Sequence, residues 1–373
     1  MNNRSRKVQS QFKLKPTCLA VLLAFGVQMA EANPIGGAVV NGQASFNANG
    51  NTLTVTNTPG TIINWQGFSI GANEATVFAQ QSAASTVLNR VVTNAPSSIL
   101  GALQSNGRVF LINPNGIVFG AGATVDVAGL VATTLNLSNA DFLAGRYNFT
   151  QVPGAQNISN AGSLTARNGG EIYLIAPNVD NSGIINAPNG EVLLAAGHSV
   201  QLVNSLDPNL RVSITAPAGD VTNVGQLVAS AGSLGLFGTV VRNSGVVNAS
   251  SAVAQGGKVV FKASLRVEAG GTISANGTSG GSVNISAAHS LDPNAPGVVI
   301  QTGVIQAQGV AGAGGAVHLS ADNILSAAAI NVDGTTAGGL INLQAANRAL
   351  STSSAQYAAN SISGIGGDGG GQR

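Results

Sequence analysis

GGEIYLIA, at residues 169–176, is the phrase that decides the fold, because it returns in altered form along the chain. The later copies are GEVLLAAG at 190–197, GGKVVFKA at 256–263, GGSVNISA at 280–287, GGAVHLSA at 314–321 and GGLINLQA at 338–345. Between them stands a shorter phrase, such as NAGSLTA from 160 and NSGVVNA from 243. Most copies alternate apolar with small or polar residues, the pattern of a strand with one buried face. A recurrence of about 20 to 30 residues predicts the coils of a β-solenoid.

Each coil of such a solenoid contributes two or three short strands, which pair in parallel with their copies in the next coil about 4.8 Å away. Inward positions need branched apolar side chains, and corners need Gly or Asn, which tolerate positive φ and can stack in ladders. We therefore expect one inward column of equivalent positions: Ile172, Val192, Val259, Val283, Val317 and Ile341. At about 20 residues a coil, the chain predicts ~17 coils and a rod of roughly 80 Å.

Composition supports an all-β protein. Charged residues make up only 8% of the chain and glycine accounts for 50 of 373 residues, while hydrophobic residues reach 44%. That hydrophobic content argues against disorder. Lys, Glu and Met, which favour helices, are scarce, whereas Val, Ile, Thr, Asn and Gly dominate.

The N-terminus has the pattern of a cleaved Sec signal peptide. A basic segment precedes the apolar run Cys18–Ala30, and Ala30-Glu31-Ala32 predicts cleavage before Asn33. The run is too short to span a bilayer of about 30 Å as a helix. Of the chain's 16 basic and 14 acidic residues this segment holds 5 and 1, so the rest keeps 11 and 13, a net charge near −2. The sequence therefore predicts export by the Sec machinery and no nucleic-acid partner.

These patterns predict a signal peptide at 1–32 and repeats that end in a flexible Gly-rich tail, and the division into a first domain at 33–250 and further repeats at 251–373 is implied by the family resemblance given below. The first domain is less regular before residue 150 and holds the only tryptophan, Trp65, with most of the other aromatic residues. Because an open solenoid end exposes strand edges and core, we expect an N-terminal cap and lateral hairpins here, with the aromatic side chains packed in the core.

The strongest local motif is RVFLINPNGIVFGAGA at 108–123. Two strand pieces flank Asn113-Pro114-Asn115-Gly116. Pro114 fixes its own φ and favours an extended Asn113, and Asn-Gly is a strong signal for a tight turn. Taken alone, the motif predicts a rigid polar turn between two strands.

In context, this turn resembles the two-partner secretion domain, or haemagglutination activity domain, of the filamentous haemagglutinin and high-molecular-weight adhesin family. Segments 44–80, 85–93, 129–149 and 193–217 are similar to further blocks of that domain. The resemblance implies a right-handed parallel β-helix and a cognate outer-membrane TpsB-type transporter with periplasmic recognition domains. It also implies transporter recognition by Asn113, Pro114, Asn115, Gly116 and Ile117. Many members carry a second motif, NPNL, upstream of STVLNRV, and this chain lacks it there.

The resemblance further implies a secreted or cell-surface adhesin of a Gram-negative bacterium, with host or bacterial surface glycans as candidate ligands. Two alternatives remain open: a β-helix polysaccharide-active enzyme and the front end of a contact-dependent toxin. The three histidines, His198, His289 and His318, are far apart, and acidic residues come singly, although stacking could bring Glu171 beside Glu191. We therefore predict no catalytic residues, no metal site and no cofactor.

Overall fold

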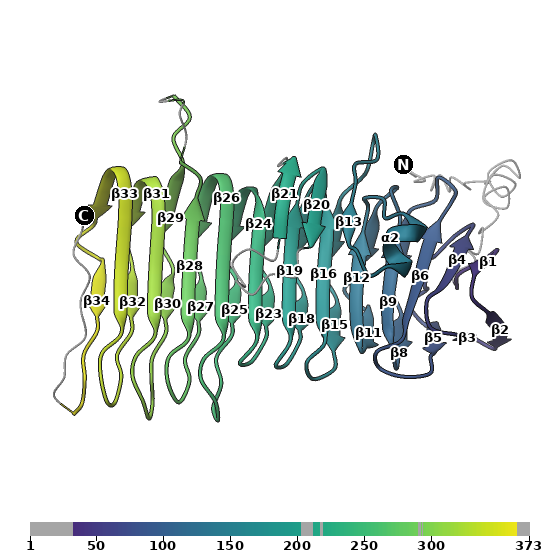
Figure 1. Ribbon diagram of the computed structural model, residues 1–373, viewed down its shortest axis with the longest axis horizontal. Coiled ribbons are helices and arrows are strands. Elements are labelled where there is room, and N and C mark those ends of the chain that lie inside the picture. Colours follow the sequence, from purple (N-terminus) through teal and green to yellow (C-terminus); the bar gives the residue numbers. More distant parts are fainter. Residues whose placement is uncertain (1–32, 203–211, 217–218, 290–291, 293, 364–373) are drawn as a thin grey trace, which may run out of the picture.

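The computed structural model describes residues 33–202, 212–216, 219–289, 292 and 294–363, which form one elongated rod of stacked coils (Figure 1). The chain is a parallel β-helix, as predicted: strands from successive coils pair side by side along the rod, and α2 (Asn139–Leu143) is its one described α-helix. The expected signal segment 1–32 and most of the Gly-rich tail lie outside the described residues.

One coil consists of β16 (Glu171–Ala176), β17 (Val179–Asn181) and β18 (Ile184–Asn186). The next coil repeats them as β19 (Glu191–Ala196), β22 (Asp220–Asn223) and β23 (Gln226–Val228), and all three pairs are parallel. In later coils the first two strands merge into one long, bent strand, as in β24 (Ser233–Asn243) and β26 (Lys258–Ala269). The phrase that begins with glycine is therefore the first strand of each coil, and the shorter phrase is the third.

The remaining strands fall into the same series. First strands are β4 (Thr61–Trp65), β6 (Thr86–Val91), β9 (Arg108–Ile112), β12 (Gly129–Thr133), β28 (Ser282–Ala287), β31 (Ala316–Ser326) and β33 (Leu340–Ser351). Second strands are β7 (Ser97–Ile99), β10 (Ile117–Phe119), β14 (Ile158–Asn160) and β29 (Val298–Gln301). Third strands are β3 (Thr52–Asn57), β5 (Ala75–Ala79), β8 (Ala102–Ser105), β11 (Thr124–Val127), β15 (Ser163–Ala166), β25 (Val246–Asn248), β27 (Thr272–Ser274), β30 (Val304–Gln306), β32 (Ala329–Asn331) and β34 (Gln356–Ala358).

The predicted inward column is confirmed. Ile172 pairs with Val192, and Val259, Val283, Val317 and Ile341 follow in register, with Leu234 between Val192 and Val259. None of the seven side chains is more than 2% exposed. The hydrophobic core is therefore a continuous column along the rod, and each buried aliphatic side chain in it is worth about 1.5–3 kcal/mol.

The rod is shorter than predicted. The sheet of third strands, which also includes β2 (Ala44–Asn49), has 13 strands instead of ~17, and so spans roughly 60 Å at 4.8 Å per step. Part of the difference arises because the chain leaves the rod between a first and a second strand, at 134–157 and again at Ser199–Leu202 and Val212–Ala216. These segments add no coils.

A glycine precedes each first strand from β16 onward for a steric reason. A Cβ on Gly257 would lie 2.1 Å from the carbonyl oxygen of Gly232, and the same contact recurs one coil on at Gly281. Before this glycine, several coils need a positive φ, which Gly169 adopts at 77° and Ala231 at 57°. The glycine directly before each of these strands is thus a packing requirement, and Gly169 is also a turn requirement.

Buried asparagines form the predicted ladder at one corner. The side-chain nitrogen of Asn160 donates to Asn181 Oδ1 (2.8 Å), Asn181 donates to Asn223 (2.7 Å), and Asn223 donates to Asn243 (2.7 Å). Each is at most 3% exposed. Stacking satisfies amide groups that would otherwise be buried without partners.

The expected N-terminal cap is also present. β1 (Ala38–Asn41) runs antiparallel to β4, and β2 runs antiparallel to β3, so the first layer reverses the direction of the coils beneath it. Phe46 of β2 packs edge to face on Trp65 beneath it, and Trp65 packs edge to face on Phe68, with ring centroids 5.4 and 5.7 Å apart. The aromatic side chains therefore fill the wide first coils.

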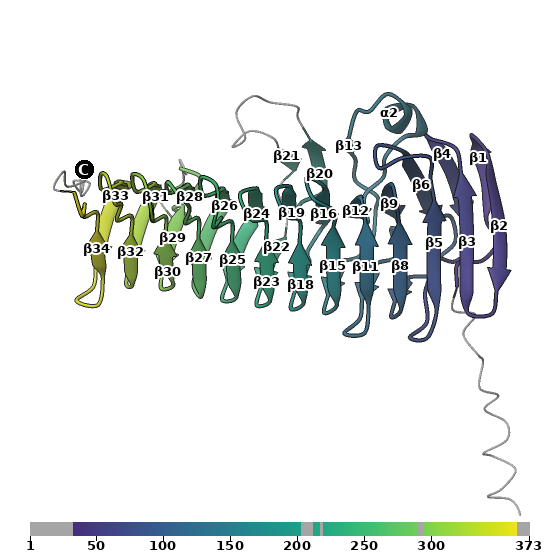
Figure 2. The same cartoon turned by 90° about the horizontal axis from the view of Figure 1, so that it is seen from below.

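A lateral layer covers the outer face of the first-strand sheet (Figure 2). It consists of α2 and a three-stranded antiparallel sheet of β13 (Asn148–Phe149), β20 (Ser199–Leu202) and β21 (Val212–Ala216). Phe142 and Phe149 from this layer pack on Phe110 and Leu193 in a second hydrophobic cluster outside the rod. This corrects one expectation: these aromatic residues do not pack in the main core, because they lie on a segment that leaves the coil.

Candidate functional site

The Asn-Pro-Asn-Gly motif forms a tight turn between β9 and β10. The Gly116 amide donates to the Asn113 carbonyl (3.2 Å), and Gly116 has a φ of 104°, which favours glycine. Ile117 is fully buried and continues into the core column of second strands. The sequence therefore predicted the turn and its glycine correctly.

Asn113 is fully buried, and its side chain forms hydrogen bonds within the protein. Its Nδ2 donates to the Ala95 carbonyl (2.9 Å) and to Ser97 Oγ (2.9 Å), and its Oδ1 accepts from the backbone amide of Asn115 (3.0 Å). The bonds to Ala95 and Ser97 join the turn to the preceding coil, and the bond from the Asn115 amide is a hydrogen bond within the turn. Asn113 accordingly has a structural role in shaping the corner.

Pro114 and Asn115 are the partly exposed residues of the motif. Asn115 Nδ2 donates to the Thr93 carbonyl in the preceding coil (2.8 Å), and the Pro114 carbonyl accepts from the Gln156 amide in the following one (2.9 Å). Beside them, residues 92–96 are all exposed, and Val92 exposes 55% of its surface. Any partner at this corner would meet Pro114, Asn115 and this neighbouring loop.

The corner continues without a break to the N-terminal cap. Asn115 is bonded to Thr93, the Thr93 hydroxyl donates to the Gln66 carbonyl (2.5 Å), and the Gln66 amide donates to the Ile35 carbonyl (3.0 Å). These residues belong to four successive layers of the rod. The motif is thus one step of a hydrogen-bonded edge that ends at the cap.

A partly buried ion pair lies on the outer face at the start of β9, at the opposite end of this strand from the motif. Glu171 is only 7% exposed, and Arg108, the first residue of β9, forms a 2.5 Å salt bridge with it. Burial alone would lower the pKa of Arg108, but the hydrogen bond and charge of Glu171 raise it above its ordinary value. Glu171 and Glu191 do stack in register, and Glu191 accepts a hydrogen bond from the Tyr173 hydroxyl (2.5 Å). Stacking therefore brings the two glutamates together, as the sequence suggested, and Glu171 is buried.

Apolar runs could have indicated this covered surface. RVFLI in β9 and EIYLIA in β16 are apolar on both faces, the pattern of strands buried on two sides, whereas SVNISA in β28 alternates. The contrast marks where the lateral layer lies.

The three histidines remain apart, and their surroundings differ. His318 points outward from β31, and His289 forms a 2.9 Å contact through Nδ1 with the buried Asp322. Among the described residues, no group of three or more His, Cys, Asp or Glu side chains could hold a metal ion. A search of the same residues finds no helix long and apolar enough to span a membrane.

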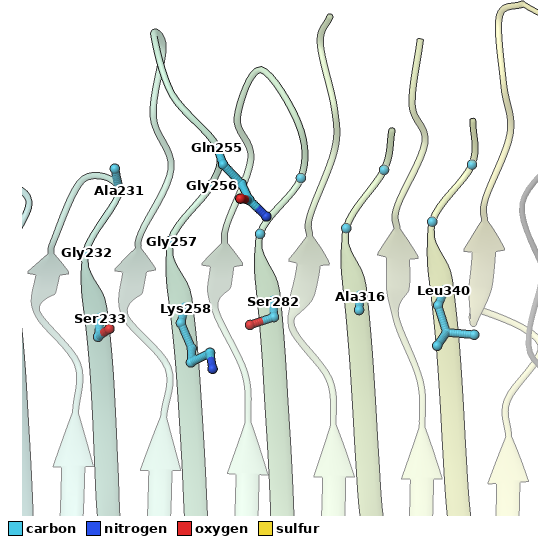
Figure 3. Close-up of a pocket in the computed structure, with 16 residues that line it drawn as sticks. Ala231, Gly232, Ser233, Gln255, Gly256, Gly257, Lys258, Ser282, Ala316 and Leu340 are labelled. Carbon is cyan, nitrogen blue, oxygen red and sulfur yellow. The ribbon is translucent and has the colours of Figure 1, made fainter. Parts of the chain in front are cut away.

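A shallow groove of about 740 Å³ crosses five coils beside the glycines that precede the first strands (Figure 3). Its lining includes Gly232, Gly257, Gly281, Gly315 and Gly339, and Lys258 is the one charged side chain among the lining residues. Because each glycine is required by the carbonyl of its neighbour, the groove follows from coil packing.

Comparison with known proteins identifies the class. Residues 30–275 match the family model of the TPS secretion domain, so the chain belongs to this family of two-partner secretion exoproteins. Their TPS domain implies a cognate TpsB outer-membrane transporter, and its members are secreted or reach the cell surface.

Individual relatives agree with this assignment. The crystal structure of the HMW1 secretion domain from Haemophilus influenzae superposes with a TM-score of 0.75 at 29% identity, covering 88% of this chain and 99% of that one. A heme/hemopexin-binding protein from Haemophilus influenzae is 42% identical over 130 residues, which are 34% of this chain and 14% of that protein. A second heme/hemopexin-binding protein is 39% identical over 89 residues. The chain thus matches a small part of these curated relatives.

Proposed function

We propose that this chain is an adhesin-type exoprotein whose Asn113–Ile117 corner is recognised by the periplasmic recognition domains of its transporter. After signal cleavage between Ala32 and Asn33 by the Sec pathway, this corner would select the chain for passage through the outer membrane. The observation that carries the proposal is the position of the motif: a rigid turn whose exposed part, Pro114 and Asn115, stands beside the exposed loop 92–96.

Hydrogen bonding would dominate recognition at this corner, because the motif has no charged residue. The two hydrogens of Asn115 Nδ2 are used inside the protein, by the Thr93 carbonyl and by Asn113 Oδ1, so Asn115 would offer its Oδ1 as an acceptor, and Pro114 offers a fixed apolar surface. Asn113 and Ile117 support the proposal indirectly, since both are buried and hold the turn in place.

The test is secretion of Asn115→Ala in cells that carry the transporter. We expect the extracellular amount to fall at least ~5-fold while signal cleavage stays unchanged and the melting temperature of the refolded protein falls only slightly, because two partly exposed hydrogen bonds, to Thr93 and Asn113, are lost. Asn168→Ala, an exposed asparagine at another corner, is the matched control and should be secreted normally. Normal secretion of Asn115→Ala would contradict the proposal.

Asn113→Ala separates recognition from stability. Removal of its amide leaves the Ala95 carbonyl and the Asn115 amide without their partner, at a cost of about 1–3 kcal/mol. We therefore expect a lower melting temperature, and a secretion loss that follows the loss of folded protein.

As an adhesin, the exported rod would bind host or bacterial surfaces, with surface glycans as the candidate ligands. Adherence of transporter-positive cells, with and without this chain, tests that role. Depolymerisation of acidic polysaccharide by the purified protein would instead favour a β-helix enzyme, and an adjacent immunity gene would favour a contact-dependent toxin.

A further inference from the structure

The turns that lead from third strands to first strands become longer in the later coils. Before β16, β19 and β24 this turn has four residues, and from β25 onward it has seven to nine. Figure 1 shows the longer turns as loops along one edge of the C-terminal half of the rod. We call these longer turns, with the segment that follows β34, the turn ridge: residues 249–257, 275–281, 307–315, 332–339 and 359–363.

The turn ridge is hydrogen-bonded from coil to coil. Each turn donates a backbone amide to a carbonyl of the preceding turn: Thr278 to Ala254 (2.8 Å), Val310 to Gly277 (2.9 Å), Thr335 to Gly309 (3.0 Å) and Ile362 to Gly334 (3.3 Å). The five turns are therefore an ordered continuation of the coils. Their outer side chains follow one another at the coil spacing of about 4.8 Å.

The outer side chains of the turn ridge alternate between apolar and polar. Val253, Val310 and Ile362 are 90, 68 and 87% exposed, more than any other large apolar side chain among the described residues. Thr278 and Thr335 belong to the turns between them. The apolar side chains thus recur at every second turn, about 10 Å apart. One exposed valine needs no explanation, but three apolar side chains in register along a ridge indicate a contact surface.

A groove runs directly beside this ridge. It is the hollow of about 740 Å³ across five coils, and Gln255 of the turn ridge and Lys258 and Ser282 at the starts of first strands line it (Figure 3). A ridge and a parallel groove on the same edge of a rod complement each other. If a second copy is turned by 180° about an axis across the rod, the ridge of each copy meets the groove of the other, which is the isologous contact of a two-fold dimer.

The levels of ridge and groove match in this arrangement. The ridge comprises the turns before β26, β28, β31 and β33 and the segment after β34, and the groove begins one coil earlier, at the start of β24. With the two-fold axis between the coils of β28 and β31, the five turns of each copy therefore meet the five coils of the partner's groove. Each exposed valine then lies level with a threonine of the other copy, so the outer side chains can interdigitate.

Charge complementarity favours a second copy as the occupant. Asp333 is the only charged residue in the sequence of the turn ridge, and Lys258 is the only one among the residues that line the groove. Three coils, about 14 Å, separate them along one rod, so they do not pair within a copy. The two-fold arrangement places Lys258 of each copy level with Asp333 of the other. Two opposite charges then meet at each end of the contact.

We propose that the turn ridge and its groove form the interface of an antiparallel two-fold dimer of this chain. Val253, Val310 and Ile362 of each copy pack into the partner's groove, and the two pairs of Lys258 with Asp333 set the register. The interface lies in later coils than the Asn113–Ile117 corner, and it does not depend on the proposed function.

The first test measures self-association of residues 33–373 by sedimentation equilibrium. We expect a reversible dimer with a dissociation constant on the order of 10 µM. Val253→Ser combined with Val310→Ser should raise this constant at least ~10-fold and leave the melting temperature unchanged, because both side chains are exposed. Leu143→Ser combined with Val224→Ser is the matched control: these side chains are 52 and 55% exposed outside the turn ridge, and association should stay within about 2-fold of wild type.

The second test addresses the antiparallel register. Lys258→Glu alone places two carboxylates at each end of the contact, and Asp333→Lys alone places two amines there. Each variant should associate at least ~10-fold more weakly than wild type at low salt. An equimolar mixture of the two variants restores opposite charges at both ends, so it should form dimers about as tightly as wild type.

Three results would overturn the proposal. The first is a wild-type chain that stays monomeric at about 200 µM, well above the expected dissociation constant. The second is a dimer that the double valine variant leaves unchanged, and the third is a mixture of folded charge variants that does not associate. If the wild-type monomer instead binds phosphatidylcholine vesicles and the double valine variant does not, the ridge is a lipid contact and the dimer is wrong.

Discussion

The coils from β9 to β26 and the coils from β28 to β33 share one inner column but have different outer faces. Inside, Ile172 and Val317 are equally buried in the same column. Outside, the column that contains Val131, Leu193 and Val260 continues through Asn284 to His318 and Asn342. The apolar members lie under or beside the lateral layer, and the polar members are partly exposed.

This comparison teaches that the inward-facing and the outward-facing residues of the same strands follow two separate hydrophobic patterns. The inner pattern builds a rod and continues through both regions. The outer pattern is restricted to the first region, and the family match ends at residue 275, between β26 and β28, where the outer column changes from apolar to polar. We propose this change as the end of the secretion domain, slightly beyond the expected boundary at 250.

The largest effect should come from a charge in the shared inner column. Ile172→Asp and Val259→Asp would each bury an unpaired carboxylate, and we expect both to lose about 4 kcal/mol or more of unfolding free energy. Ser286→Asp, outward and partly exposed on β28, is the control and should cost little. Urea unfolding followed by circular dichroism measures the loss. Wild-type stability of both core variants would mean that the strand phase is inverted.

A smaller effect should distinguish the two outer faces. Leu193→Ser removes an apolar side chain, 2% exposed, from the cluster under the lateral layer, and we expect a loss of about 3 kcal/mol. His318→Ser, in the same column on the uncovered face, should change stability by less than ~0.5 kcal/mol. Equal losses in the two variants would remove the distinction between the faces.

The smallest effect compares two ion pairs. Arg108→Met leaves the carboxylate of Glu171 buried without its cation, at an expected cost of about 2 kcal/mol. Arg242 binds Asp220 on an exposed face, with 42 and 39% of the two side chains accessible, so Arg242→Met should cost less than ~1 kcal/mol. Thermal unfolding at low and high salt checks the ranking. Salt should weaken the Arg242 pair more than the Arg108 pair.

The repeat phrases predicted the coil, its inward column and the asparagine ladder, because these depend on spacing alone. Leu234 was missed; its strand follows Ala231-Gly232, and Ala231 adopts the positive φ that Gly169 has in an earlier coil. A backbone that strains a non-glycine residue gives no sign of it in the sequence. The number of coils was overestimated partly because the segments between β12 and β14 and between β19 and β22 have no repeat phrase that sets them apart.

Less of the candidate site could be predicted. The turn at Asn113–Gly116 follows from its residue types, but the burial of Asn113 depends on Ala95 and Ser97 in the preceding coil, 16 to 18 residues away. The exposure of Val92 could not be predicted either, because most valines in this sequence are buried. Which side of a turn faces solvent is decided by neighbouring coils, and one sequence does not contain their relative placement.

The parallel ladders also determine how the rod would respond to tension. Hydrogen bonds between coils run along the rod axis, so a pull at its two ends loads them in series, one coil after another. Each coil of about 20–25 residues that detaches would lengthen the molecule by roughly 70–80 Å before the next coil bears the force. The rod would then yield in equal steps and dissipate work, and its rupture force would be that of a single coil, whatever the total length.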